Sequence, residues 1–157
     1  MEIIKADMSY FEAVNRITHD TINAVYPHYY PDGAVKFFID YHNKESIIND
    51  IEAGKVFILL EDGVTAGTVT INNNDIGRFF VLPEYQGRGF GSKLLHFAEK
   101  LVFSEYNEAV LSSSFPAKQI YLSKGYVTTD YHILDAFGDH LCFDNMKKKK
   151  EDFEREA

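Results

Sequence analysis

Three segments of strand character stand directly before one long segment of helical character, and this order most constrains the fold. Residues 56–60 are a continuous apolar run, and the Asp-Gly pair after them favours a hairpin turn because both residues tolerate positive φ. Residues 65–71 and 76–82 have the pattern of two further strands, and Gly77 indicates a bulge or a close backbone approach. Apolar residues then recur at helical spacing from 89 to 103. We therefore expect an antiparallel meander followed by a helix that packs on it.

The flanking segments extend this pattern at both ends. Ser9 and Glu12 have the spacing of a capping box, before a predicted helix that Pro27 ends. Further helices are expected after Asp32 and over residues 43–54. The remaining predicted elements are strands over 2–6, 108–114, 126–134 and 138–146, and a short helix over 116–124. The predicted fold class is α+β, in a single domain.

Composition excludes several classes of protein. The chain has 157 residues, the size of one domain, and its net charge of −8 argues against nucleic-acid binding, which usually needs a basic surface. The single cysteine, Cys142, excludes an internal disulfide and is predicted to pack in the core. We find no signal peptide and no apolar run of roughly 18 residues, so the expected location is cytoplasmic, without membrane contact. The lysine run and the residues after it predict a solvated, charged tail over 147–157, outside a domain of residues 1–146.

A glycine-rich turn joins the third strand to the long helix, and it is the segment most informative about function. Gly87, Gly89 and Gly91 remove side chains where a ligand would approach the backbone. The first N–H groups of the following helix have no partners within the helix, and the helix dipole adds partial positive charge, so the turn suits a pyrophosphate. Its spacing, G-x-G-x-G, differs from the dinucleotide fingerprint G-x-G-x-x-G, and the order Gly91-Ser92-Lys93 does not match a P-loop.

The same segment resembles the signature of the GCN5-related N-acetyltransferase (GNAT) superfamily, V-x-P-x-x-Q-G-x-G-x-G. The matching residues are Val81, Pro83, Gln86, Gly87, Gly89 and Gly91. The resemblance extends to the order of elements over residues 1–146, and it implies a central, mostly antiparallel sheet flanked by helices, with acetyl-CoA as the cosubstrate. It also implies that the backbone of Phe79, Phe80 and Val81 hydrogen-bonds the pantetheine arm. The N–H groups of Gly87, Arg88, Gly89, Phe90, Gly91 and Ser92 would hold the pyrophosphate, and Gln86 is a further expected cofactor-binding residue. The alternative for Arg88 is that its side chain is an ordinary surface charge without a role in binding.

Residues 114–126 resemble the second signature of the family, N-x-x-A-x-x-x-Y-x-x-x-G-[FY]. The matching positions are Ala117, Tyr121, Gly125 and Tyr126. By this resemblance Tyr121 is the general acid that protonates the departing sulfur. Ser114 stands where the family usually has asparagine, and its shorter side chain has less reach toward CoA. The alternative for Tyr121 is a helix tyrosine that only packs.

The acceptor side is less sharply defined by the sequence. An alkylamine with a pKa of about 10.4 is almost entirely protonated at neutral pH, so a base or an ordered water must remove a proton. Residues 109–113 contain no carboxylate for this role. The resemblance places the connection after the first helix beside the acceptor pocket, and the sequence there contains His28, Tyr29 and Tyr30. These side chains can hold an ammonium group and relay a proton, or they can simply pack on the core.

The leading interpretation is an N-acetyltransferase that moves the acetyl group of acetyl-CoA to a primary amine by direct attack in a ternary complex. The alternative is a catalytically silent acyl-CoA-binding or sensor module on the same fold, and a third interpretation is transfer of a longer acyl group or to a hydroxyl acceptor. The sequence does not identify the acceptor, which is a small molecule or a peptide. The histidines lack metal-ligand spacing, so no metal is predicted. A homodimer is left open because many members of the superfamily dimerise.

Overall fold

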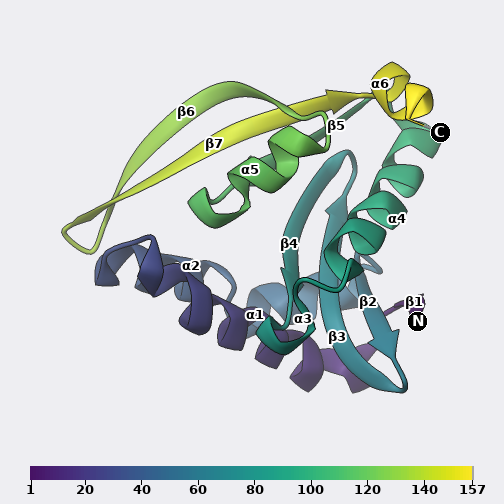
Figure 1. Ribbon diagram of the computed structural model, residues 1–157. Helices are drawn as coiled ribbons and strands as arrows, with labels where there is room; N and C mark the ends of the chain where they lie inside the picture. The colour runs from purple at the N-terminus through teal and green to yellow at the C-terminus, as the bar shows by residue number, and fades with distance from the viewer. Residues whose placement is uncertain (157) are drawn as a thin grey trace.

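Within residues 1–156, one seven-stranded sheet has the strand order β1-β2-β3-β4-β5-β7-β6 (Figure 1). The structure is a computed structural model and describes residues 1–156. The strands are β1 (Glu2–Lys5), β2 (Val56–Glu61), β3 (Val64–Asn72), β4 (Asp75–Val81), β5 (Glu108–Ser113), β6 (Val127–Ala136) and β7 (Asp139–Lys149). The helices are α1 (Phe11–Val25), α2 (Asp32–Tyr41), α3 (Lys44–Glu52), α4 (Phe90–Glu105), α5 (Phe115–Ser123) and α6 (Lys150–Arg155), with short 3-10 turns η1 (Met8–Tyr10), η2 (Tyr26–His28) and η3 (Pro83–Tyr85). All neighbouring strands pair antiparallel except β4 and β5, which confirms the predicted α+β class.

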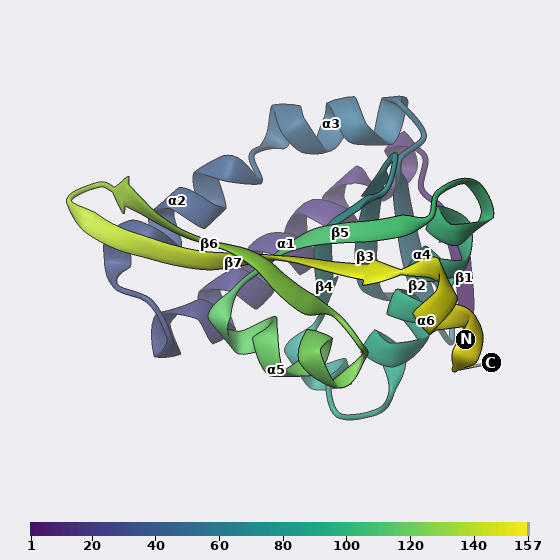
Figure 2. The ribbon, with the colours of Figure 1, turned by 90° about the horizontal axis from the view of Figure 1, so that it is seen from above.

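Helices cover both faces of the first part of the sheet. Figure 2 shows α1, α2 and α3 on one side of the strands and α4 and α5 on the other. From one side α1 turns Val14 and Ile17 inward, both fully buried, and from the other side α4 does the same with Leu94 and Ala98. The strands between them are covered on both faces, which explains why β2 is a continuous apolar run. Every helix in the described residues, 1–156, is too short or too polar to traverse a lipid bilayer.

The start of the first helix differs from the prediction. The Asp7 side chain, rather than that of Ser9, acts as the cap: its carboxylate accepts a hydrogen bond from the Ser9 backbone N–H at 2.9 Å and another from the Ser9 hydroxyl. Ser9 therefore lies inside the 3-10 turn η1, and α1 begins at Phe11 without a side-chain cap. The predicted capping box of Ser9 and Glu12 is wrong, because an aspartate two residues upstream competes successfully for the same hydroxyl.

The end of the chain also differs from the prediction. Instead of starting a solvated tail at residue 147, β7 continues to Lys149, and α6 packs Phe153 against the main core. The Lys148 side chain is fully buried, with its Nζ 3.3 Å from Glu99 on α4 and 2.8 Å from Glu156. A run of lysines looks solvated when it is considered alone, but the alternation of a strand turns one of them inward. The carboxylates of Glu99, from α4, and of Glu156, eight residues after Lys148 in the chain, then compensate its charge.

Removing the Lys148 charge should reveal how much the stability of the fold depends on the ion pairs of Lys148 with Glu99 and Glu156. Lys148→Met leaves the Glu99 carboxylate buried without its partner, so we expect the free energy of unfolding to fall by about 3–5 kcal/mol. The double variant Lys148→Met/Glu99→Met removes both buried charges and should recover most of that loss. Urea unfolding of the three proteins measures both effects. A double variant that is no more stable than Lys148→Met would contradict this pairing.

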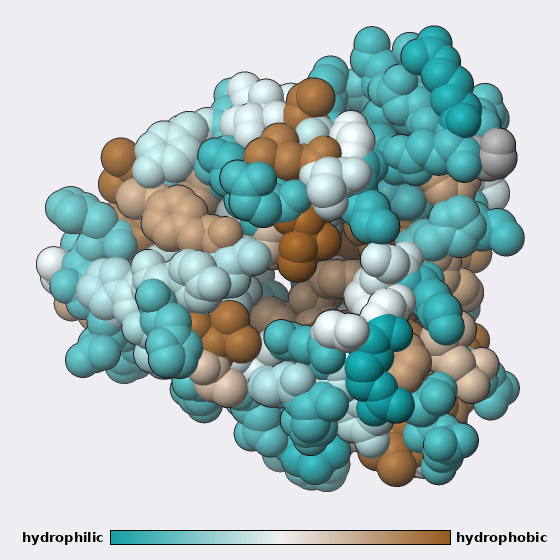
Figure 3. All heavy atoms as spheres, viewed as in Figure 1, coloured by the Kyte–Doolittle hydropathy of each residue, from teal (hydrophilic) through white to brown (hydrophobic). Residues whose placement is uncertain are grey.

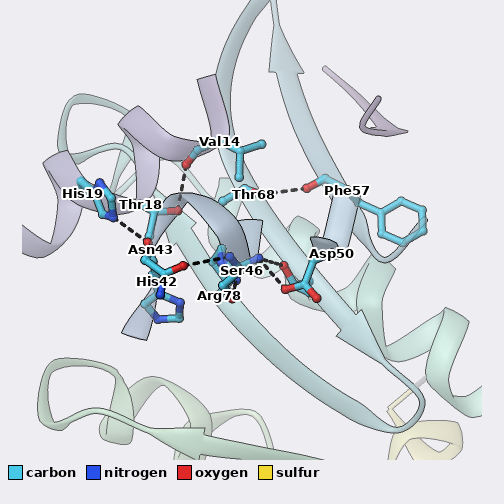
Figure 4. A network of polar contacts seen from close by, with 11 residues as sticks. Val14, Thr18, His19, His42, Asn43, Ser46, Asp50, Phe57, Thr68 and Arg78 are labelled. Atoms are coloured by element: carbon cyan, nitrogen blue, oxygen red, sulfur yellow. Dashed lines mark hydrogen bonds and ion pairs between the residues drawn. The ribbon is translucent and has the colours of Figure 1, made fainter. Parts of the chain in front are cut away.

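A buried histidine lies where α2 meets α3. Figure 4 shows His42 below α1, beside Arg78 of β4, and its backbone carbonyl accepts a hydrogen bond from His19 Nε2 at 2.7 Å. The His42 ring meets the Phe80 ring edge-on, with centroids 5.7 Å apart, and its Nδ1 is buried without a hydrogen-bond partner among residues 1–156. Burial lowers the pKa of His42 to about 3, and the nearby positive charge of Arg78 and the neighbouring His19 add to the shift.

This shift makes stability depend on pH in a defined window. The imidazole takes up a proton in the unfolded chain below about pH 6.5, whereas the folded protein keeps it neutral until about pH 3. Stability should therefore fall on acidification through this window, by about 2 kcal/mol at pH 5 relative to pH 7 from this group. Urea unfolding of the parent and of His42→Gln at both pH values isolates that share, because the other groups titrate in both proteins. An equal loss in the two proteins would contradict the prediction.

Candidate functional site

The two parallel strands in the middle of the sheet separate soon after they begin. Within residues 1–156, the register of β4 on β5 consists of the single pair Asp75 and Val110, beside a backbone hydrogen bond from Val110 N–H to the Asn74 carbonyl at 2.9 Å. Beyond this point β4 and β5 diverge in both ribbon views, and the space-filling view in Figure 3 is hollowed at the same place. The edge of β4 that faces β5 is therefore open toward its carboxyl end, where an extended ligand can pair with it.

A β-bulge shapes the open end of β4. The register on β3 changes between the pairs Thr70–Gly77 and Thr68–Phe80, so β4 carries one residue more than β3 between them. Arg78 lies in this bulge with a φ of +40°. The predicted bulge near Gly77 is thus confirmed, although the unusual backbone conformation belongs to its neighbour. A close backbone approach does not explain the glycine, because a Cβ at position 77 would meet nothing within 4 Å.

The glycine-rich turn follows β4 directly and opens α4. Gly87 and Gly89 have φ values of +74° and +81°, and a Cβ on either would meet nothing within 4 Å, so conformation rather than crowding within the chain requires glycine there. Gly89 is the N-cap of α4 and offers no side chain to the first N–H groups of the helix. Gln86 ties the turn back to the strand, since its Nε2 donates a hydrogen bond to the Val81 carbonyl at 2.9 Å.

Two cationic side chains lie at this helix N-terminus. The Arg88 guanidinium is 5.3 Å from the Tyr85 ring centroid and 5.0 Å from that of Phe90, and the Lys93 ammonium is 5.9 Å from the Phe90 centroid. Both cations are exposed. Uncapped N–H groups, a helix dipole and two nearby cations together form a site suited to an anion such as a pyrophosphate.

The tyrosine expected to act as an acid lies on the other side of the opening. Tyr121 on α5 is 6% exposed, and its ring centroid is 6.4 Å from that of Phe79 on β4 and 5.6 Å from that of Tyr126. Burial raises the pKa of the Tyr121 phenol above its ordinary value, so it stays protonated at neutral pH. Ser114 is the N-cap of α5, and its side chain makes no capping hydrogen bond. The structure thus places the Tyr121 ring near the Phe79 ring.

The aromatic connection after α1 divides into buried and exposed parts. Tyr30 is 6% exposed, its hydroxyl accepts a hydrogen bond from the Phe115 backbone N–H at 2.8 Å, and the two rings stack with centroids 5.1 Å apart. Tyr29 is 53% exposed, and His28 also lies at the surface. Tyr30 is therefore brought to the start of α5, within the part of the chain that carries Ser114, whereas His28 and Tyr29 are left facing solvent.

Sequence reasoning missed residues that shape this region. Tyr26 is buried between Tyr30 and Phe80, with ring centroids 5.6 and 6.3 Å away, and it belonged to the same aromatic run that predicted the acceptor side. Arg78 had a signal of its own, since a lone arginine within an apolar strand needs a partner. His42 had no local signal, because its burial depends on how α2 and α3 meet β4.

The comparison with known proteins agrees with this geometry. A family model described as an acetyltransferase (GNAT) domain matches residues 25–150. No curated protein sequence matches the chain.

Several solved structures have the same fold as this chain. A GCN5-related N-acetyltransferase from Rhodopseudomonas palustris superposes with a TM-score of 0.86 at 18% identity, over 94% of each chain. The PaiA N-acetyltransferase from Thermoplasma acidophilum, solved with coenzyme A, gives 0.75 at 21% identity over 94% of this chain and 98% of that one. The acetyltransferase YncA from Salmonella typhimurium, solved with acetyl-CoA and described as putative, gives 0.72 at 19% identity over 95% and 93%. The match of the family model over most of the chain shows that this protein belongs to the GNAT family of acetyltransferases.

Proposed function

We propose that this protein transfers the acetyl group of acetyl-CoA to a primary amine, by direct attack of the amine on the thioester in a ternary complex. The observation that carries the proposal is the opening between β4 and β5, with the uncapped N-terminus of α4 at one end and the Tyr121 phenol beside it. Two proteins of the same fold were solved with coenzyme A or acetyl-CoA, which supports the same cosubstrate here.

The cosubstrate is expected to use the strand and the turn in different ways. The pantetheine arm carries amide groups, and these can pair with the backbone of residues 79–81 along the open edge of β4. The pyrophosphate suits the N–H groups from Gly87 to Ser92, which side chains of the turn do not cap. Arg88 and Lys93 add positive charge at the same place. This arrangement directs the thioester toward Tyr121.

The chemistry requires one proton to leave the amine and one to reach the sulfur. The neutral amine adds to the thioester carbonyl, the tetrahedral intermediate collapses, and the C–S bond breaks as the sulfur gains negative charge. Because the phenol of Tyr121 stays protonated, it can donate a hydrogen bond to that sulfur. Its raised pKa exceeds the value of about 8.5 for a thiol, so stabilisation of the departing sulfur precedes any completed proton transfer.

The Tyr121 phenol should contribute to turnover and not to cosubstrate binding. In Tyr121→Phe we expect kcat to fall roughly 100-fold, the usual scale for a positioned acid, with the acetyl-CoA Kd changed less than about twofold. CoA release with a panel of amines measures kcat, and calorimetry measures binding. Tyr131→Phe is the matched control, because Tyr131 is 55% exposed on the β6–β7 hairpin.

The same assays distinguish the two main functional hypotheses. Turnover by the parent protein that falls strongly in Tyr121→Phe supports the enzyme. Tight acetyl-CoA binding without turnover on any amine instead favours the catalytically silent binding module. Undiminished turnover in Tyr121→Phe would remove Tyr121 from the proposed mechanism.

Tyr29 and Tyr30 should behave differently when they are substituted. Tyr30→Phe leaves the Phe115 N–H without its acceptor, so we expect about 1–2 kcal/mol lower stability and a reduced kcat from displacement of α5. If Tyr29 borders the acceptor, Tyr29→Ala, which removes the ring, should raise the acceptor KM without a loss of stability. Tyr29→Phe, which keeps the ring, is the comparison. Steady-state kinetics and urea unfolding of these variants test both statements. An unchanged acceptor KM in Tyr29→Ala would remove Tyr29 from the acceptor site.

A further inference from the structure

Arg78 combines a strained backbone with a buried charged side chain. Its φ is +40°, a region that large side chains rarely occupy, and its side chain is only 7% exposed. Strained residues of this kind persist where the surrounding structure holds them, and they gather at functional sites. Arg78 stands one residue before the segment 79–81, which borders the opening between β4 and β5.

Three side chains from two elements hold the guanidinium in place (Figure 4). Arg78 Nη1 donates to Asp50 Oδ2 at 2.9 Å and to Thr70 Oγ1 at 3.2 Å, and Nη2 donates to Ser46 Oγ at 3.0 Å. Asp50 and Ser46 belong to α3, and Thr70 belongs to β3. The bulge is therefore fixed from outside β4, by a helix on one face of the sheet and by the neighbouring strand.

The position of the bulge determines which face of the sheet each following side chain of β4 points to. At the end of the bulge Phe79 turns its ring toward Tyr121, whereas Phe80, which pairs with β3 again, turns its ring toward Tyr26 and His42. The backbone of β4 then pairs with Thr68 and Gly67, and a Cβ at Gly67 would lie 3.1 Å from the Phe80 carbonyl oxygen. Because the side-chain period of a strand is two, loss of the extra residue would reverse the faces of every residue after it.

We propose that Arg78 is a positioning residue for acetyl-CoA. Its hydrogen bonds to Asp50 and Ser46, here called the clamp, fix the bulge that presents the backbone of residues 79–81 to the pantetheine arm. This inference rests on the proposed function. By this proposal, cosubstrate affinity depends on α3 as well as on the glycine-rich turn. Helix α3 lies outside the cosubstrate site and acts through β4.

The variants separate three properties of Arg78: the hydrogen bonds of the clamp, the strained backbone and the positive charge. Arg78→Gly accepts the positive φ but loses the clamp, Arg78→Lys keeps the charge, and Asp50→Asn keeps the shape of the acceptor side chain. Asp40→Asn is the matched control, because Asp40 also pairs with a basic residue, Lys36, but on the exposed surface of α2. The measurements are acetyl-CoA Kd by calorimetry, the KM of each substrate, urea unfolding, and amide hydrogen exchange of residues 79–81.

We expect Arg78→Gly to weaken acetyl-CoA binding about tenfold and Asp50→Asn about threefold, with partial rescue in Arg78→Lys, no change in Asp40→Asn and an unchanged acceptor KM. Amide exchange of residues 79–81 should accelerate in Arg78→Gly, whereas the amides of β2 stay protected. A clamp that served stability alone would lower the unfolding free energy and leave the acetyl-CoA Kd of the folded variants unchanged, and that result overturns the proposal. If Arg78→Gly fails to fold, Asp50→Asn and Ser46→Ala decide by the same criteria.

Failure of the proposed function is distinguishable from failure of the clamp. A parent protein that binds acetyl-CoA without turnover contradicts transfer, while the Kd values still judge the clamp. A parent protein that does not bind acetyl-CoA overturns both the proposed function and the role of Arg78 in binding. Unchanged amide exchange at residues 79–81 in Arg78→Gly overturns the clamp alone.

Discussion

The separation of β4 from β5 is the constraint on which the rest of the structure depends. Parallel strands normally gain a regular series of slanted hydrogen bonds, and here that series stops after one register pair. The backbone groups that remain unpaired on the edge of β4 would be costly if they were buried without partners. Since they face the hollow in Figure 3, solvent or a ligand can satisfy them, and a strand-like ligand restores the missing pairing.

The two parts of the sheet on either side of the opening must stay separated there and yet remain joined elsewhere. On one face, α4 packs on β3, β4 and β5 and so joins the two halves through the main core. At the open end, Tyr30 reaches from the connection after α1 to the first residues of α5, and its ring stacks on Phe115. The buried Lys148 secures the far end by tying β7 to α4 and to the end of the chain. The three links use different kinds of interaction, and two of them, through Tyr30 and through Lys148 with Glu99, join segments that are distant in sequence.

This dependence on distant partners explains what the sequence could and could not predict. The strands, the turn at Asp62 and Gly63 and the glycine-rich turn follow from local patterns and from φ values that only certain residues accept. Lys148 was misjudged because its partner Glu99 lies 49 residues earlier in the chain. Tyr30 was assigned to the acceptor side, and its hydrogen bond to residue 115 has no local signature. The charge of Arg78 in an apolar strand was a signal for a buried partner, but its strained backbone could not be predicted, because the strain depends on the register with the neighbouring strand.

Charge presents a similar contrast between the whole chain and the site. A net charge of −8 repels an anionic cosubstrate, but salt screens exposed charges beyond about 8 Å at physiological ionic strength. The lysines of β7 give little help near the turn, since Lys147 pairs with Glu108 and Lys148 with Glu99 and Glu156. At the start of α4, by contrast, Arg88 and Lys93 rest against aromatic rings, which leaves their charge available to an anion. The proposed anion binding therefore depends on a few local groups within one turn of helix, and it is compatible with an acidic protein.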